Sequence, residues 1–158
     1  MKKNIFAFIF FFLMFFFTSF PSSADSLFVL NIFNSKTSSI LFKTTIQPGE
    51  SFFIETIHSL AKTPYTHIFK VDEKGEIFLS GAIYESEGGG YPLATDGSFS
   101  YKNGKFFMDN MNRFVGILRF RVSPISRETF KYHTMEIPLY NLVSEGTLLY
   151  IQVEMKKE

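Results

Sequence analysis

The chain contains no cysteine among its 158 residues. It can therefore form no disulfide, carry no lipid on an N-terminal cysteine, and supply no thiolate to a metal. It also lacks an excess of either charge, with 16 Lys and Arg against 15 Asp and Glu. That balance argues against a general nucleic-acid binder, which needs a basic face, and against electrostatic docking on anionic lipid. No stretch after the first 24 residues is apolar enough to span a membrane.

The N-terminus has the three parts of a secretory signal peptide. Two lysines precede the apolar run IFAFIFFFLMFFFTSF at residues 5–20, and Ser22 and Ala24 stand three and one places before Asp25. An uncleaved membrane anchor is the alternative, but this run is shorter than the roughly 20 residues that cross a bilayer. We expect a signal peptide at residues 1–24 and an exported protein, periplasmic or extracellular, with no stable membrane anchor after cleavage.

The remaining residues, 25–158, have the length of one domain. Short segments rich in Phe, Ile, Val, Thr and Tyr alternate with a period of two and are bounded by Asn, Gly, Ser and Pro. We expect strands at 26–33, 39–46, 51–59, 65–72, 76–86, 98–101, 105–108, 114–122, 129–137 and 148–155. This pattern predicts an all-β fold, a single-domain antiparallel β-sandwich or partly open barrel.

The turns are legible at several places. Asn-Gly at 103–104 has the composition of a two-residue type I′ hairpin, because both central positions need positive φ. Lys-Gly at 74–75 is a looser signal, and residues 34–38 join the first two strands. Residues 108–114 and 137–146 could each hold one helical turn.

A zinc site would have to use the histidines with carboxylates such as Glu55 or Glu85. If the LAKT segment closes a hairpin with His58 opposite Tyr65, then His58 and His67 are diagonal neighbours on one sheet face. A register shift of one residue would separate them onto opposite faces. The spacing is not a compact ligand motif, and half-exposed strand histidines are the alternative. We expect no metal and no cofactor.

A small hydrolase centred on His58, dependent on this histidine or on a metal, is a second functional hypothesis. Ser59 adjoins His58, but neighbouring side chains of an extended chain point to opposite faces, and no G-x-S-x-G elbow is present. The glycine run Gly88, Gly89 and Gly90 does not lead into a helix, as a phosphate-cradling loop would. It could still line a pocket, because glycine lets a ligand approach the main chain.

The first functional hypothesis is a binding site at one corner of the β fold. If residues 50–59, 64–72 and 76–86 form a meander, the first and third strands end at the same edge, about 10 Å apart. The glycine loop could then fold over His58 and bind a small organic anion or a partner's chain terminus. Alternatively, His58 and its neighbour only hold the loop by hydrogen bonds. The candidate binding residues are His58, Ser59, Tyr65, Ser86, Gly88, Gly89, Gly90, Arg119 and Arg121.

The two arginines enter this set because in ILRFRVS they share one strand face, with apolar residues on the other. Adjacent guanidinium groups make a plausible clamp for carboxylate or phosphate. The alternative is the solvated face of a half-buried strand, with the arginines paired to Glu128 or Glu136.

The order of the segments from Gly49 to Pro92 has a known counterpart. Its elements are Gly49-Glu50, His58-Ser59, Thr63-Pro64, Phe69, Val71-Asp72 with Gly75, and the loop from Ser86 to Pro92. This order resembles the small exported family known as domain of unknown function 1850, and the resemblance covers most of residues 27–155. The departures are Thr56 for the family's usual Tyr, Glu87 for Phe, Gly89 for Ala and Tyr91 for Leu.

The resemblance implies an exported accessory to solute uptake. Genes of this uncharacterised family often neighbour fused permeases of the TRAP transporter class that use TAXI-type solute receptors. Such transporters import organic acids or amino acids. By resemblance, a TRAP-type permease or its solute receptor is the expected partner, and the protein is expected to bind rather than to catalyse.

Overall fold

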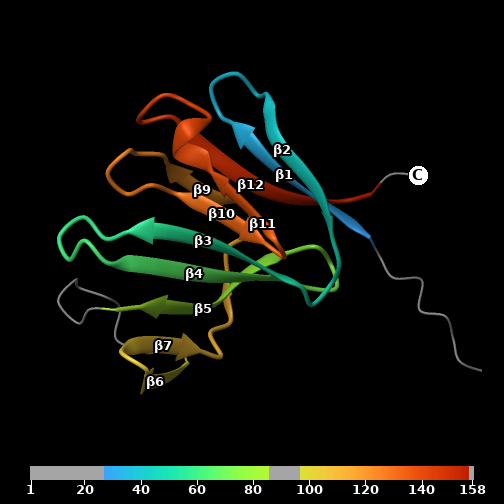
Figure 1. Ribbon diagram of the computed structural model, residues 1–158. Helices are drawn as coiled ribbons and strands as arrows, with labels where there is room; N and C mark the ends of the chain where they lie inside the picture. The colour runs from blue at the N-terminus through green and yellow to red at the C-terminus, as the bar shows by residue number, and fades with distance from the viewer. Residues whose placement is uncertain (1–26, 86–96, 157–158) are drawn as a thin grey trace, which may run out of the picture.

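The computed structural model describes residues 27–85 and 97–156 of the chain (Figure 1). The predicted signal peptide lies outside these residues. So does the glycine loop, which holds the candidate site residues Ser86, Gly88, Gly89 and Gly90.

Two antiparallel sheets form the fold, which confirms the predicted all-β sandwich. The small sheet has the spatial order β2 (Ile40–Ile46), β1 (Phe28–Asn34), β12 (Leu148–Met155) and β9 (Leu118–Arg121). The large sheet has the order β11 (Met135–Pro138), β10 (Thr129–Tyr132), β3 (Ser51–Ile57), β4 (Pro64–Val71), β5 (Ile77–Tyr84), β7 (Lys105–Asp109) and β6 (Ser98–Lys102). The short strand β8 (Arg113–Phe114) also pairs with β5, and a single 3-10 turn, η2 (Leu139–Asn141), follows β11.

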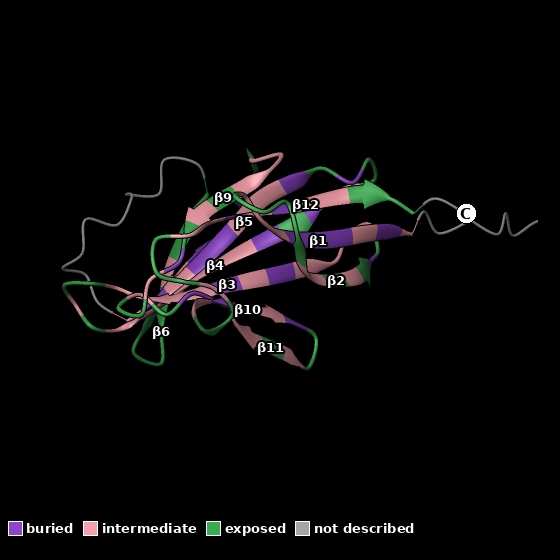
Figure 2. Ribbon diagram, turned by 90° about the horizontal axis from the view of Figure 1, so that it is seen from above, coloured by how far each residue is buried: buried purple, intermediate pink, exposed green. Residues whose placement is uncertain are grey.

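The main core lies between the facing sides of the two sheets, where the alternating apolar residues meet (Figure 2). Phe52 of β3 packs against Phe69 and Phe130 of the neighbouring strands, with ring centroids 5.3 and 5.7 Å away. Phe42 of β2 reaches across from the small sheet to Phe130, with 5.6 Å between the centroids. Burial of this aromatic and aliphatic face stabilises the contact between the sheets.

A second, smaller core lies farther along the large sheet. Its buried members come from β5, β7 and the segment after β7: Ala82, Tyr84, Phe106, Met108 and Met111. Tyr84 and Phe106 stack with their centroids 5.3 Å apart.

One end of the sandwich, which we call the loop end, gathers the connections after β1, β3, β5, β6, β9 and η2 (Figure 1). Backbone hydrogen bonds join these segments: Ser35 N–H donates to Leu148 O at 3.0 Å, and Gly146 N–H donates to Val122 O at 2.9 Å. The opposite end gathers the connections after β2, β4, β7 and β10.

Two segments were each predicted to form one strand, and in the structure each of them forms two. Residues 114–122 are divided at Gly116, which has φ +64°, so β8 pairs with β5 and β9 pairs with β12 in the other sheet. Residues 129–137 fold into a hairpin of β10 and β11, with His133 at φ +50° in the turn. In both segments the alternation of side chains continues through a turn that the pattern alone did not reveal.

The turn predictions were mostly confirmed. Asn103 and Gly104 have φ of +52° and +78°, as the predicted hairpin between β6 and β7 requires. The helical turn expected within 137–146 is present as η2, whereas the one expected at 108–114 is wrong, because that segment is the end of β7 followed by β8.

Within the described parts of the chain, no helix is both long and apolar enough to cross a bilayer.

Candidate functional site

His58 lies at the loop end, immediately after β3, and its own hairpin loop holds it in place. Its backbone N–H donates to Thr63 O at 2.9 Å, and its carbonyl accepts from Lys62 N–H at 2.8 Å. Its imidazole Nδ1 accepts a hydrogen bond from Ala61 N–H at 3.1 Å. The loop therefore spans residues 59–62, with Lys62 in the left-handed region at φ +57°.

This loop sets a register two residues away from the expected one. Thr56, not His58, lies opposite Tyr65, and Ile54 lies opposite His67. The predicted diagonal pairing of His58 with His67 is therefore wrong. By alternation the two histidines still fall on the same face. Thr63 lies opposite His58, and His67 is four residues beyond Thr63, which separates the two histidines by roughly 13 Å along the strand direction.

In the two described stretches, no three side chains of His, Cys, Asp or Glu gather closely enough to hold a metal ion.

The hydrogen bond at Nδ1 defines the chemistry that His58 offers. A neutral imidazole has one donor and one acceptor nitrogen, so an accepting Nδ1 assigns the proton to Nε2. In a hydrolytic triad the assignment is the reverse: a carboxylate accepts from Nδ1–H, and Nε2 takes the proton of the nucleophile. In this arrangement Nε2 is the donor atom of the His58 ring.

Ser59 is exposed in the hairpin turn. The period of two predicts His58 and Ser59 as neighbours in an extended strand, but β3 ends at Ile57. The hydroxyl of Ser59 therefore lies on the exposed loop and not on a face of β3.

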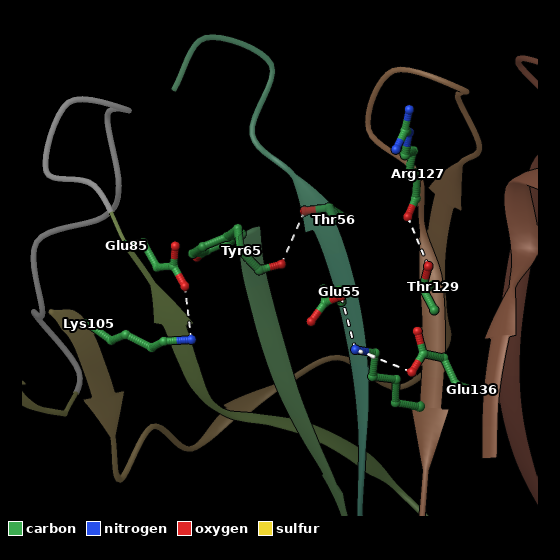
Figure 3. Close-up of polar contacts among 9 residues, drawn as sticks. Glu55, Thr56, Tyr65, Glu85, Lys105, Arg127, Thr129 and Glu136 are labelled. Atoms are coloured by element: carbon green, nitrogen blue, oxygen red, sulfur yellow. Dashed lines mark hydrogen bonds and ion pairs between the residues drawn. The ribbon is translucent and has the colours of Figure 1, made fainter. Parts of the chain in front are cut away.

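Tyr65 begins a row of rings across the large sheet. Its ring meets the edge of His67 with centroids 4.4 Å apart and lies 5.8 Å from Tyr84, whose ring stacks on Phe106. The Thr56 hydroxyl donates to the backbone carbonyl of Tyr65 at 3.3 Å (Figure 3). Burial lowers the pKa of His67 to about 4, so this imidazole is neutral at pH 7.

The predicted meander is confirmed, because β3 and β5 flank β4 and end at the same edge. His58 and Glu85, the last described residue before the glycine loop, both lie at this edge. Glu85 forms an ion pair with Lys105 of β7, with 2.9 Å between Oε1 and Nζ (Figure 3). The structure thus places His58, Ser59 and Tyr65 at the same end of the large sheet as Glu85.

The structure places Arg119 and Arg121 in the small sheet, away from the large sheet that carries His58 and Tyr65. Both are exposed on β9 at the edge of the small sheet, whereas Leu118 and Phe120 pack on the core. Their guanidinium groups therefore point away from the large sheet, and Arg121 donates to Gly146 O at 2.7 Å. The two acids proposed as their partners are used elsewhere. Glu128 accepts from Ser123 N–H and the Ser126 hydroxyl, and Glu136 lies 3.7 Å from Lys131.

A carboxylate site at the opposite end was missed by the sequence reasoning. Glu50 accepts from the Tyr132 hydroxyl at 2.5 Å and from Gln47 N–H at 2.8 Å, and its other oxygen lies 3.2 Å from His133 Nε2. Burial alone would raise the pKa of Glu50, but these three partners more than offset it, so the pKa lies below its usual value. Burial and this carboxylate raise the pKa of Tyr132. Residues 50 and 132 are far apart in sequence, so the only signal in the sequence is that Tyr132 and His133 are adjacent.

A family model described as Domain of unknown function (DUF1850) matches residues 52–139, more than half of the chain. The chain belongs to this family. The match begins in β3 and ends at η2, so it covers nearly all of the large sheet and β9, whereas β1, β2 and β12 lie outside it. Every candidate binding residue lies inside the matched span. No curated protein and no solved structure matches the chain.

Proposed function

We propose that this member of the family is an exported, non-catalytic binding protein that works as an accessory to solute uptake by a TRAP-type transporter. Its binding site is the corner at the loop end where His58, Ser59 and Tyr65 lie beside the last residue before the glycine loop. The ligand class is a small organic anion, and the partner is the permease or its solute receptor. The family resemblance supports the transporter part of the proposal.

The observation that carries the binding function is the hydrogen bond from Ala61 N–H to His58 Nδ1. It makes Nε2–H a donor with a fixed direction, because the same loop also holds the backbone of His58 at two points. A carboxylate oxygen is a strong acceptor for such a donor. A rigid β scaffold that presents fixed donors from its loops is a common arrangement in binding proteins.

The alternative is a small hydrolase in which His58 acts as a general base. That reaction needs an accepting nitrogen directed at a nucleophile, with a carboxylate orienting the other nitrogen. His58 would have to give up its bond to Ala61 and change tautomer to serve this role. Loss of an esterase activity in His58 variants would favour this alternative.

The experiment uses two substitutions of His58. In His58→Asn, the Oδ1 atom can replace Nδ1 as the acceptor for Ala61 N–H, but the Nε2–H donor is lost. His58→Ala loses both. Each variant is assayed for solute uptake in cells that depend on the neighbouring permease, and for melting temperature with and without the probes succinate and glutamate.

We expect uptake to fall at least tenfold in both variants, with a near wild-type melting temperature for His58→Asn. We also expect a probe-induced rise in melting temperature for the wild type only. Normal uptake by His58→Asn together with a lower melting temperature of His58→Ala would show that His58 only holds its loop. In the same preparations, the intact mass of exported protein should correspond to a chain that begins at Asp25.

A further inference from the structure

The loop end carries exposed aliphatic side chains on four separate segments. Leu60 is 79 % exposed on the hairpin after β3, and Ile125 is 60 % exposed on the connection between β9 and β10. Leu142 is 47 % exposed after η2, and Ile40 is 51 % exposed where β2 begins. Single exposed apolar residues are normal, but a group of them at one end of a molecule indicates a surface that contacts something apolar.

These segments are neighbours in space. The Ile57 N–H before the Leu60 loop donates to Ser126 O, beside Ile125, at 2.6 Å. The Leu139 N–H at the start of η2 donates to Glu128 O at 2.9 Å. In Figure 1 the corresponding loops project from the same end of the sandwich, and Figure 3 shows the Arg127 loop beside the hairpin after β3. The four aliphatic side chains therefore belong to one end of the fold.

The charges of the described residues are divided between the two ends. The loop end carries the basic residues Lys36, Lys62, Lys102, Lys105, Arg121 and Arg127. Its acidic residues in the described parts are Glu85, Glu128 and Glu145. Glu85 is paired with Lys105, and Glu128 is buried with its hydrogen bonds satisfied inside its own loop. Among the described residues, the exposed charges of this end are therefore predominantly basic.

The opposite end has the reverse balance among its described residues. Its acidic residues are Glu50, Asp72, Glu73, Glu76, Asp109 and Glu154, and its basic residues are Lys70, Lys74, Arg113 and Lys156. The near-zero net charge of the chain thus conceals a molecule with one basic and one acidic end.

We propose that the loop end docks reversibly on an anionic lipid surface. The aliphatic tips enter the boundary between headgroups and acyl chains, and Lys62, Arg127 and the other basic residues face the lipid phosphates. Each contribution alone is weak, but apolar insertion and electrostatic attraction add when they act on one face. The acidic opposite end would then point away from the membrane, which fixes the orientation of the protein.

The chemistry of the surface favours lipid over a protein partner. Protein interfaces concentrate their binding energy in Trp, Tyr and Arg that fill pockets, and leucine is under-represented among such residues. Here the four aliphatic contacts are leucine and isoleucine on separate segments, as suits insertion into a fluid surface, and Tyr101, 60 % exposed near the end of β6, adds one aromatic ring. The proposal does not depend on the ligand corner at His58, although docking would place that corner close to a permease.

The test is sedimentation with vesicles, using the chain from residue 25 onwards, which contains every described strand and the whole core. Vesicles of phosphatidylglycerol and phosphatidylethanolamine are compared with phosphatidylcholine vesicles at low and high salt. The apolar variant is Leu60→Asp with Ile125→Asp, and its matched control is Met155→Asp, which changes a residue 70 % exposed at the opposite end. The charge variant is Lys62→Glu with Arg127→Glu, and its control is Lys74→Glu.

We expect binding to the anionic vesicles only, at least tenfold weaker for both loop-end variants, unchanged for both controls, and reduced by salt. All substituted side chains are exposed, so melting temperatures should stay close to that of the wild type. No sedimentation with anionic vesicles, or equal binding by the loop-end variants, would overturn the proposal. Binding that appears only when the vesicles contain the permease would overturn it in favour of a protein partner.

Discussion

At the scale of single residues, His67 shows how position changes chemistry. The sequence presents three histidines as comparable candidates, but the fold packs the half-buried ring of His67 between neighbours on the inner face of β4. Tyr65 and Phe69 lie on either side of it, with centroids 4.4 and 6.0 Å away. The pKa near 4 has one cause, the loss of solvation of the charged ring.

This pKa predicts an acid-sensitive stability. Below pH 6.5 the unfolded chain binds a proton at His67, whereas the folded chain does not until about pH 4. The unfolded state is therefore favoured as the pH falls through this window, by up to about 1.4 kcal/mol per pH unit. In His67→Gln this contribution is absent, so urea denaturation between pH 7 and pH 4.5 should give a shallower loss of stability than in the wild type. Parallel profiles for the two proteins would contradict the assignment.

At the scale of elements, the hairpins differ in what they contact. Gly75, in the turn between β4 and β5, and Gly104, in the turn between β6 and β7, have similar φ of +81° and +78°. A Cβ at Gly75 would lie 2.7 Å from the ring of Phe28, a core residue of the small sheet, whereas a Cβ at Gly104 would have nothing within 4 Å. The turn at Gly75 is thus part of the contact between the sheets.

The two glycines form a matched pair for a test. Both Gly75→Ala and Gly104→Ala should lose roughly 1 to 2 kcal/mol of unfolding free energy, because alanine is strained at positive φ. Gly75→Ala should lose a further 1 to 3 kcal/mol, roughly, because the ring of Phe28 is buried and cannot move aside without repacking. Urea unfolding of both variants measures the difference. Equal losses would mean that the turn can shift away from Phe28.

At the scale of the whole molecule, the residues that the family model matches make up only part of the fold. The matched residues 52–139 supply the large sheet, but the residues that cover its core come mainly from β1 and β12. Leu30, Ile32, Leu149 and Ile151 are all fully buried in that cover. Each such side chain contributes about 1.5 to 3 kcal/mol when buried, and whole domains are stable by only about 5 to 15 kcal/mol.

A chain of residues 51–139 should therefore not fold by itself. We expect no cooperative thermal transition and poorly dispersed amide resonances, whereas a chain of residues 27–156 should show both a cooperative transition and good dispersion. Cooperative unfolding of the shorter fragment would mean that the large sheet closes its own core.

The sequence by itself determined the fold class, most strand positions, the meander of β3, β4 and β5, and the family. These features rest on local information: a period of two, turn residues such as Asn103 and Gly104, and the order of short motifs along the chain. The same local signal failed where alternation continued through a turn. It therefore missed the crossing between sheets at Gly116 and the hairpin at His133.

The tertiary structure alone decided which residues meet. The register of β3 and β4 depends on a loop that starts one residue earlier than expected, and that shift separated His58 from His67. Arg119 and Arg121 lie on the far face of the other sheet, and Glu50 finds Tyr132 and His133 across the fold. Charge is the clearest case. The net charge of the chain is near zero, but the pairing of strands leaves an excess of basic residues at one end and an excess of acidic residues at the other among the described residues. Long-range contacts of this kind depend on sheet order and register, which local alternation does not encode.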